Sequence, residues 1–177
     1  MYIRIPGERI GVAIGPNGET KHEIERQTNT KLFFDTENFS VKVEAGNDPI
    51  GALKAQEIMK AIARGFSSRR ALRLLDDDQY LDIIDITDFA GDSGRAMLRL
   101  RGRLIGEKGR TREIMERTTE TCISVYGKTV AAIGTAEQLV VFREAIGMLL
   151  GGAMHSTVYR FLERKRRQLK AKPFPWL

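Results

Sequence analysis

The residues of this chain whose chemical role is clearest form two short loops with paired glycines. Both have the pattern Gly-x-x-Gly, at residues 15–18 and 106–109. Because glycine lacks a Cβ, such a loop reaches backbone conformations closed to other residues and lets a phosphodiester approach its amides. A charged helix is predicted after each loop, and the free N–H groups and positive dipole end at a helix start attract anions. We therefore expect both loops to bind phosphate groups.

The two loops belong to an internal repeat. Shifting the sequence by 106 − 15 = 91 positions aligns residues 10–34 with residues 101–125 without a gap. Beyond the loop glycines, Thr20 matches Thr111 and Glu25 matches Glu116. Two copies at a domain-sized spacing indicate duplicated domains, because a solenoid needs at least three shorter repeats.

Each copy predicts the order strand, helix, helix, strand, strand, helix. The second opening strand is placed at 96–100 because polar and apolar residues alternate there. The last helices have start signals, with Asp48 before Pro49 in the first copy and a Thr135/Gln138 capping box in the second. Leu53 and the apolar residues after it are expected to be core. The remaining expected elements are strands at 2–5, 31–34, 41–45, 122–126 and 129–133, and helices at 19–28 and 110–119.

The segment between the copies is expected to connect them. Residues 68–75 predict a helix, and residues 80–86 predict an extended stretch that is too apolar for a free linker and should pack between the modules. Its aspartates, at 76–78, 82, 85 and 88, form a metal site, a solvated turn or an acidic face for a protein partner; they lack the ligand order of an EF-hand. The predicted division is a first domain at 1–66, a connector at 67–93, a second domain at 94–152, and a basic helix and tail at 153–177.

Charge is distributed unevenly along the chain. Lys and Arg minus Asp and Glu give 12 − 16 = −4 for residues 1–92 and 17 − 7 = +10 for residues 93–177. The basic half attracts polyanions, of which nucleic acid is one and a membrane surface another. No apolar run has the length of a membrane span and no signal-peptide pattern is present, so we expect a cytoplasmic protein without a membrane partner.

Catalytic chemistry is not predicted. The single cysteine, Cys122, falls in an expected buried strand, and His22 and His155 lie far apart without a metal-binding or nucleophilic constellation. Neither glycine loop fits G-x-x-x-x-G-K-[ST], which a nucleotide-dependent enzyme would require. We expect a protein that is not an enzyme, with no catalytic residue, metal ligand or cofactor.

The basic segment at 153–172 has two interpretations. Its cations could add phosphate contacts, or they could be the solvated end of a helix whose dipole favours positive charge. The apolar tail at 173–177 is expected to fold back on a module or to dock into a partner.

Taken together, the loops, their flanking residues and the repeat resemble the KH family. The resemblance implies an α+β chain with two tandem type I KH domains, each a three-stranded antiparallel sheet backed by three helices. It also implies that each Gly-x-x-Gly loop clamps the backbone of about four nucleotides of single-stranded RNA beside an apolar groove. Glu107 departs from the usual pattern, since it puts an acid in the phosphate loop. Carried onto this sequence, the expected RNA-binding residues are Ile10, Gly11, Ile14, Gly15, Pro16, Asn17, Gly18, Lys21, Lys31, Leu32 and Phe33 in the first module, and Gly102, Arg103, Ile105, Gly106, Glu107, Lys108, Gly109, Arg110, Arg112, Ile123 and Ser124 in the second.

The chain is more narrowly similar to the archaeal members of the partner-of-Nob family of small-subunit assembly factors, since both loops are intact. That resemblance implies sequence-selective binding to the 3′ end of small-subunit (16S) ribosomal RNA during pre-rRNA processing and ribosome assembly. It implies assembly proteins as partners, such as the endonuclease that trims this RNA, and we expect a monomer. The alternatives are another KH RNA-binding regulator, or a protein-docking scaffold in which only the second module binds RNA.

Overall fold

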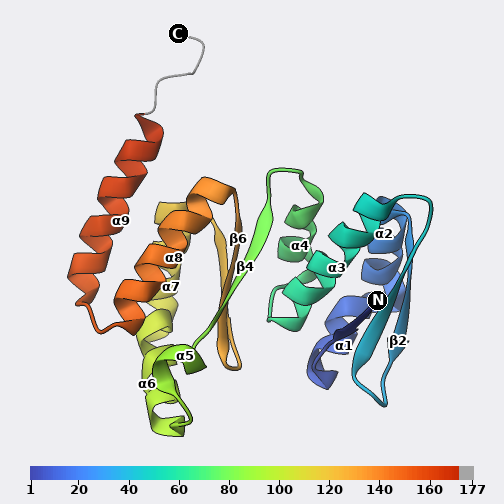
Figure 1. Cartoon of the computed structure of the whole chain (residues 1–177), viewed down its shortest axis with the longest axis horizontal. Coiled ribbons are helices and arrows are strands. Elements are labelled where there is room, and N and C mark those ends of the chain that lie inside the picture. Colours follow the sequence, from blue (N-terminus) through green and yellow to red (C-terminus); the bar gives the residue numbers. More distant parts are fainter. Residues whose placement is uncertain (172–177) are drawn as a thin grey trace. The chain divides into compact units, whose positions relative to one another are not determined.

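The structure is a computed structural model that describes residues 1–171, so the predicted role of the tail at 173–177 lies outside the described residues. Its contacts divide the chain into two compact units, the first from Met1 to Leu81 and the second beginning at Asp82. Each unit contains one three-stranded sheet covered by helices (Figure 1). The predicted α+β class with two antiparallel sheets is confirmed.

The first unit has the predicted order of elements, with a sheet ordered β1-β3-β2. Asp48 caps α3 by accepting a hydrogen bond from the Ile50 amide at 3.0 Å, as the sequence predicts. Leu53, however, was predicted as core and is 59% exposed, because it lies on the outer face of this helix. The elements are β1 (Tyr2–Arg4), α1 (Gly7–Ile14), the 3-10 turn η1 (Pro16–Gly18), α2 (Glu19–Thr28), β2 (Thr30–Asp35), β3 (Ser40–Ala45), α3 (Pro49–Ala63), α4 (Ser68–Ala71) and the 3-10 turn η2 (Leu72–Leu75).

The second unit repeats this plan with a sheet ordered β4-β6-β5, a short extra helix, α5, before α6, and an additional last helix. The capping box is present, because the Thr135 hydroxyl accepts a hydrogen bond from the Gln138 amide and the Gln138 side-chain oxygen accepts one from the Thr135 amide. The elements are β4 (Tyr80–Asp85), α5 (Thr87–Ala90), α6 (Gly94–Ile105), the 3-10 turn η3 (Glu107–Gly109), α7 (Arg110–Thr119), β5 (Cys122–Tyr126), β6 (Thr129–Gly134), α8 (Ala136–Leu150) and α9 (His155–Lys170).

The predicted strand at 96–100 is wrong, because these residues lie in α6. Met97, Leu100 and Leu104 follow one another at helical spacing and pack into the core, and Ser93 caps the helix by accepting from the Ala96 amide at 3.2 Å. The opening strand of the second sheet is instead β4, the stretch that was predicted as extended within the connector. The contacts divide the chain at Leu81, inside β4, and the boundaries predicted at 66, 93 and 152 remain predictions for the limits of the modules.

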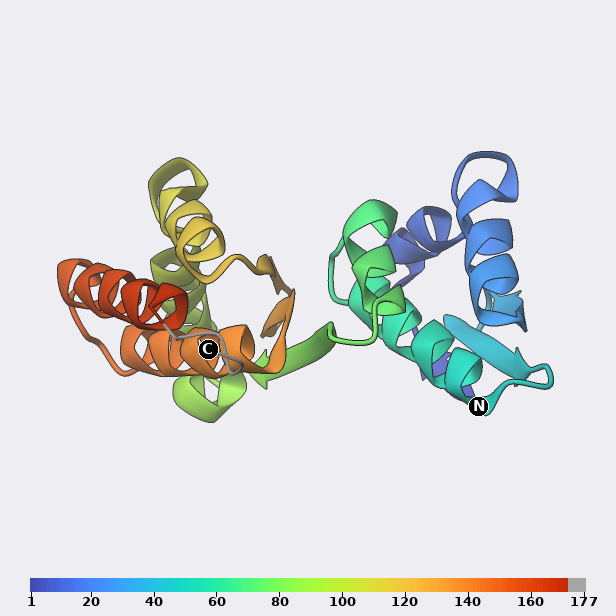
Figure 2. The same ribbon diagram turned by 90° about the horizontal axis from the view of Figure 1, so that it is seen from above.

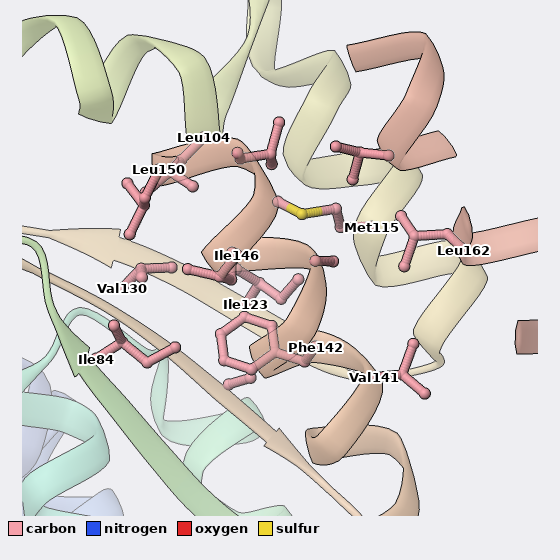
Figure 3. Packing of buried hydrophobic residues seen from close by; sticks show 14 of the residues in the cluster. Ile84, Leu104, Met115, Ile123, Val130, Val141, Phe142, Ile146, Leu150 and Leu162 are labelled. Carbon is pink, nitrogen blue, oxygen red and sulfur yellow. The ribbon is translucent and has the colours of Figure 1, made fainter. Parts of the chain in front are cut away.

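Helix α9 is part of the core of the second unit. Its Val158 and Leu162 are buried in the same cluster as Phe142 of α8, and Figure 3 shows Phe142 beside Ile123 and Ile146. Helices α8 and α9 lie side by side in both views (Figures 1 and 2). The basic segment is therefore a packed helix that exposes one face. No helix within residues 1–171 combines the length and the apolar character that crossing a bilayer requires.

Candidate nucleic-acid interface

The two Gly-x-x-Gly loops have the same backbone conformation. Gly15 has φ 74° and ψ 172°, and Gly106 has φ 73° and ψ 173°. The last glycines, Gly18 and Gly109, are left-handed with φ of 76° and 78°. This agreement holds although the residues between the glycines differ, so the glycine positions and the elements on either side define the loop.

The first glycine of each loop is required by close packing as well as by its φ. A Cβ on Gly15 would lie 2.3 Å from the Thr20 hydroxyl oxygen, and one on Gly106 would lie 2.2 Å from that of Thr111. Both threonines were visible as matching positions of the repeat, but nothing in the sequence indicated that they press against the loop. Thr20 and Thr111 therefore support the loops, and they were not among the RNA-binding residues expected from the sequence.

The helices that follow the loops begin without a side-chain cap. Gly18 and Gly109 occupy the N-cap positions of α2 and α7, and glycine has no side chain to accept from the first amides. The amides of Glu19 and Arg110 donate to the carbonyls of Pro16 and Glu107 within the 3-10 turns. The dipole of each helix adds positive potential at the same place. The geometry therefore provides an anion site at each loop.

Basic side chains gather beside the second loop. A hollow of about 540 Å³ adjoins it. Its lining residues are Glu107, Lys108, Arg110, Glu113, Ile114 and Arg117. On α2 of the first unit, by contrast, Arg26 is paired with Glu23 at 2.8 Å. Hydrogen bonds from Gln27 and Arg26 hold the pKa of Glu23 below its usual value, so this carboxylate stays charged and offsets Arg26.

The apolar candidates divide into core residues and surface residues. Ile10, Leu32 and Ile123 are buried, so they support the interface from below. Ile14 and Ile105 are half-buried directly before the loops. Gly11 and Gly102 are exposed, and a Cβ on either would meet nothing within 4 Å. The helix before each loop, α1 or α6, therefore has an exposed surface without side-chain cover one turn before the loop.

Three basic or aromatic candidates are oriented differently from what the grooves would require. Lys31 and Phe33 alternate with buried Leu32, so they lie on the face of the sheet that points away from the helices. Arg103 donates through Nε to the Leu149 carbonyl at 3.0 Å and through Nη2 to the Ala153 carbonyl. Its guanidinium therefore holds the end of α8. Sequence spacing could not reveal this, because the acceptors are distant in the chain.

The remaining candidates, except Ser124, fit the loop surroundings. Lys21 and Arg112 occupy equivalent, half-buried positions on α2 and α7, and Pro16 is exposed in the first loop. Ser124 does not fit them: it alternates with buried Ile123 on β5, so it lies, like Phe33, on the face of its sheet that points away from the helices.

Three of the aspartates of residues 76–88 have structural partners in the described part of the chain. Asp77 accepts from Lys54 at 2.6 Å, and this bond lowers the pKa of Asp77. Asp82 pairs with Arg143, and Asp85 accepts from the Thr87 amide at 2.9 Å. Within residues 1–171 no group of three or more histidine, cysteine or acidic side chains could hold a metal ion.

Two sheets in this strand order, each accompanied by a Gly-x-x-Gly loop between two consecutive helices (α1 and α2, or α6 and α7), define a protein with tandem KH domains. The model of the KH domain matches residues 1–61, and that of the eukaryotic type KH-domain (KH-domain type I) matches residues 80–167. A KH domain-containing protein of Methanocaldococcus jannaschii is 41% identical over 97% of this chain and 76% of its own length. RNA-binding protein PNO1 of Oryzias latipes is 30% identical over 75% of this chain, which spans 56% of that protein.

A solved structure has the same fold at high sequence identity. It is the crystal structure of the a/eIF2alpha–aDim2p–rRNA complex from Pyrococcus horikoshii OT3, in which one chain superposes with a TM-score of 0.89. The two are 46% identical, and the match covers 95% of this chain and 94% of that one. The chain belongs to the PNO1-like family of tandem KH-domain proteins.

Proposed function

We propose that this protein binds single-stranded RNA through both Gly-x-x-Gly loops and acts in ribosomal RNA processing. The observation that carries the proposal is the shared loop conformation, in which two glycines of positive φ lead directly into the positive dipole end of a helix. The family supports it, because a relative has been crystallised in a complex with rRNA and another is named an RNA-binding protein. KH domains bind unpaired RNA in this way.

The proposed target is the 3′ end of small-subunit ribosomal RNA, bound sequence-selectively during maturation of the subunit. In this role the protein is a binding factor and not an enzyme. Its proposed protein partners are other assembly factors, among them the endonuclease that trims the RNA end. We further propose that it acts as a monomer in the cytoplasm.

The target is tested by comparing RNAs of equal length. The unmodified chain should bind an oligonucleotide with the 3′-terminal sequence of the small-subunit rRNA more tightly than its scrambled counterpart, measured by fluorescence anisotropy. Equal affinity for the two strands would contradict sequence-selective binding. Failure to bind either strand would contradict RNA binding itself.

The loops are tested by a matched pair of charge changes, Asn17→Asp and Lys108→Asp. Both positions have the same left-handed conformation, which aspartate tolerates, so the substitutions alter charge with little backbone strain. Lys108→Asp should weaken RNA binding more, because it removes a cation that lines the hollow beside the second loop as well as adding an anion. The opposite ranking in a titration would overturn the larger role of the second module.

A further inference from the structure

The outer face of the first sheet carries a row of two aromatic side chains with a lysine between them. Tyr2 of β1 and Phe33 of β2 both lie directly opposite Lys42 of the central strand β3. The adjacent residues Leu32 and Val41 are fully buried, so strand alternation puts the row on the face away from the helices. Tyr2 is 70% exposed and Phe33 is 50% exposed.

The spacing of the row suits two separate flat ligands. Neighbouring strands lie about 4.8 Å apart, so the positions of Tyr2 and Phe33 are about 10 Å apart across the sheet. Aromatic rings pair at centroid distances of roughly 4.5 to 7 Å, and the two positions are wider apart than that. Each ring can therefore offer a face to a nucleobase.

The charges around the row favour a polyanion. Arg4 and Lys31 lie on the same outer face as the row. The carboxylate of Asp35 is engaged in the hairpin turn, where it accepts from the Glu37 and Asn38 amides at 3.0 and 2.9 Å. Glu44 is engaged by Lys42. Lys42 and Glu44 therefore offset one another, and Arg4 and Lys31 face the one remaining carboxylate, that of Asp35, which already accepts hydrogen bonds in the turn.

The second sheet does not repeat the row. The position 91 residues after Phe33 is Ser124, whose partner across the sheet is Ala131. Ala131 is fully buried, and β6 is buried along its whole length. This row, the aromatic platform of Tyr2 and Phe33, is thus a property of the first sheet. It lies on the unit whose Gly-x-x-Gly loop has fewer cations around it.

We propose that this outer sheet face is a second RNA contact, on which two unpaired bases stack against Tyr2 and Phe33 while Arg4 and Lys31 contact phosphates. The inference rests on the proposed RNA-binding function and extends it beyond the loops. Strand β2 is at the edge of the sheet and also packs against α2. An RNA strand held at the first loop can therefore pass around this edge to the outer face.

RNA strands of two lengths distinguish the contact at the Gly-x-x-Gly loop from the contact on the outer sheet face. A strand of about four nucleotides fills one KH loop site, whereas one of about 16 nucleotides also reaches the platform. Phe33→Leu keeps an apolar side chain but removes the ring. It should weaken binding of the longer strand by the full chain about tenfold, because stacking of one base contributes about 1–3 kcal/mol. Binding of the shorter strand should not change, and Phe33→Tyr should retain native affinity for both.

The matched control is Leu53→Ala, which truncates an exposed apolar side chain of the same unit on α3 and should leave both affinities unchanged. In NMR spectra of the full chain, the ring signals of Tyr2 and Phe33 should shift with the longer strand and not with the shorter one. Those local signals report on the platform even if a substitution perturbs folding.

Native affinity of Phe33→Leu for the longer strand, or ring signals that do not move at saturation, would overturn the proposal. Loss of self-association in Phe33→Leu, measured by sedimentation, with unchanged RNA affinity would also overturn it, by making the face a contact between copies. If Lys108→Asp and Asn17→Asp weaken binding of both strands while Phe33→Leu weakens neither, the loops alone bind RNA. If none of these changes affects affinity, the proposed function fails as well.

Discussion

At the scale of single residues, each phosphate loop combines two glycines with a strained residue between them. Asn17 and Lys108 both have positive φ, of 52° and 51°. Asparagine visits this left-handed region more readily than lysine does, so the second loop carries more backbone strain. Strain at a ligand site persists when the surrounding structure holds the conformation, and here Thr111 packs directly against Gly106 of the same loop.

The two glycines of the second loop should differ in their tolerance of a methyl group. Gly109→Ala meets no atom closer than 4.0 Å and has only the cost of a positive φ, about 1 kcal/mol. Gly106→Ala puts an alanine at ψ 173°, in a region of positive φ that essentially only glycine adopts, and adds a clash with Thr111, which should bring the loss to about 3 kcal/mol. Urea unfolding of the two variants measures the difference. Equal losses in the free energy of unfolding would show that the positive φ alone determines the cost of the methyl group.

At the scale of elements, both units tie the first helix to the end of the last KH helix with an arginine. Arg9 donates to the carbonyls of Ile62 and Phe66 at 2.9 and 2.6 Å, as Arg103 does to those at the end of α8. The two arginines are not aligned in the repeat, since the position 91 residues after Arg9 is Leu100. The two units thus achieve the same connection from different helix positions.

Arg103 and Arg110 should separate stability from RNA binding. Arg103→Met should destabilise the protein by about 2 kcal/mol, because two carbonyls at the end of α8 lose a charged donor, and it should change RNA affinity little. Arg110→Met removes an exposed cation and should alter stability by less than about 0.5 kcal/mol while weakening RNA binding. Chemical unfolding and RNA titration of both variants provide the measurements. A large loss of affinity in a stably folded Arg103→Met protein would restore Arg103 as a direct RNA contact.

At the scale of the whole molecule, the net charge belongs to the second unit. Residues 1–81 contain 12 basic and 12 acidic side chains, a balance of 0, and residues 82–177 contain 17 and 11, a balance of +6. Dividing the chain at residue 92 exaggerated this contrast, because the acidic residues of 82–92 belong to the basic unit. Electrostatic attraction of RNA should therefore depend mainly on the second unit.

The affinity for single-stranded RNA should fall with salt by about 0.7 log units per log unit of salt for each phosphate that the protein neutralises. Charge removal at Lys108 should lower this slope by about 0.7, because one phosphate contact is lost. The same change at Lys60, which is paired with Glu57 at 2.7 Å on α3, should leave the slope unchanged. Titrations at several salt concentrations test both statements, and an affinity independent of salt would exclude the electrostatic account.

Local chemistry in the sequence was sufficient to predict the two modules, both loops and the helix starts at Asp48 and Thr135. These features depend on glycine spacing, short-range capping and a repeat that needs no knowledge of distant contacts. The alternation at 96–100 was ambiguous, because it fits a strand as well as the buried face of a helix. Only the pairing of β4 in the sheet with β6 decided between them.

Tertiary structure alone decided which candidates can face RNA. Phe33 was grouped with the apolar groove, but the strand register turns it to the opposite face of the sheet. Arg103 was expected to contact RNA, but carbonyls 46 and 50 residues further along the chain accept its hydrogen bonds. Residue type and spacing specify what a side chain can bind, whereas its direction and its distant partners depend on how the whole chain packs.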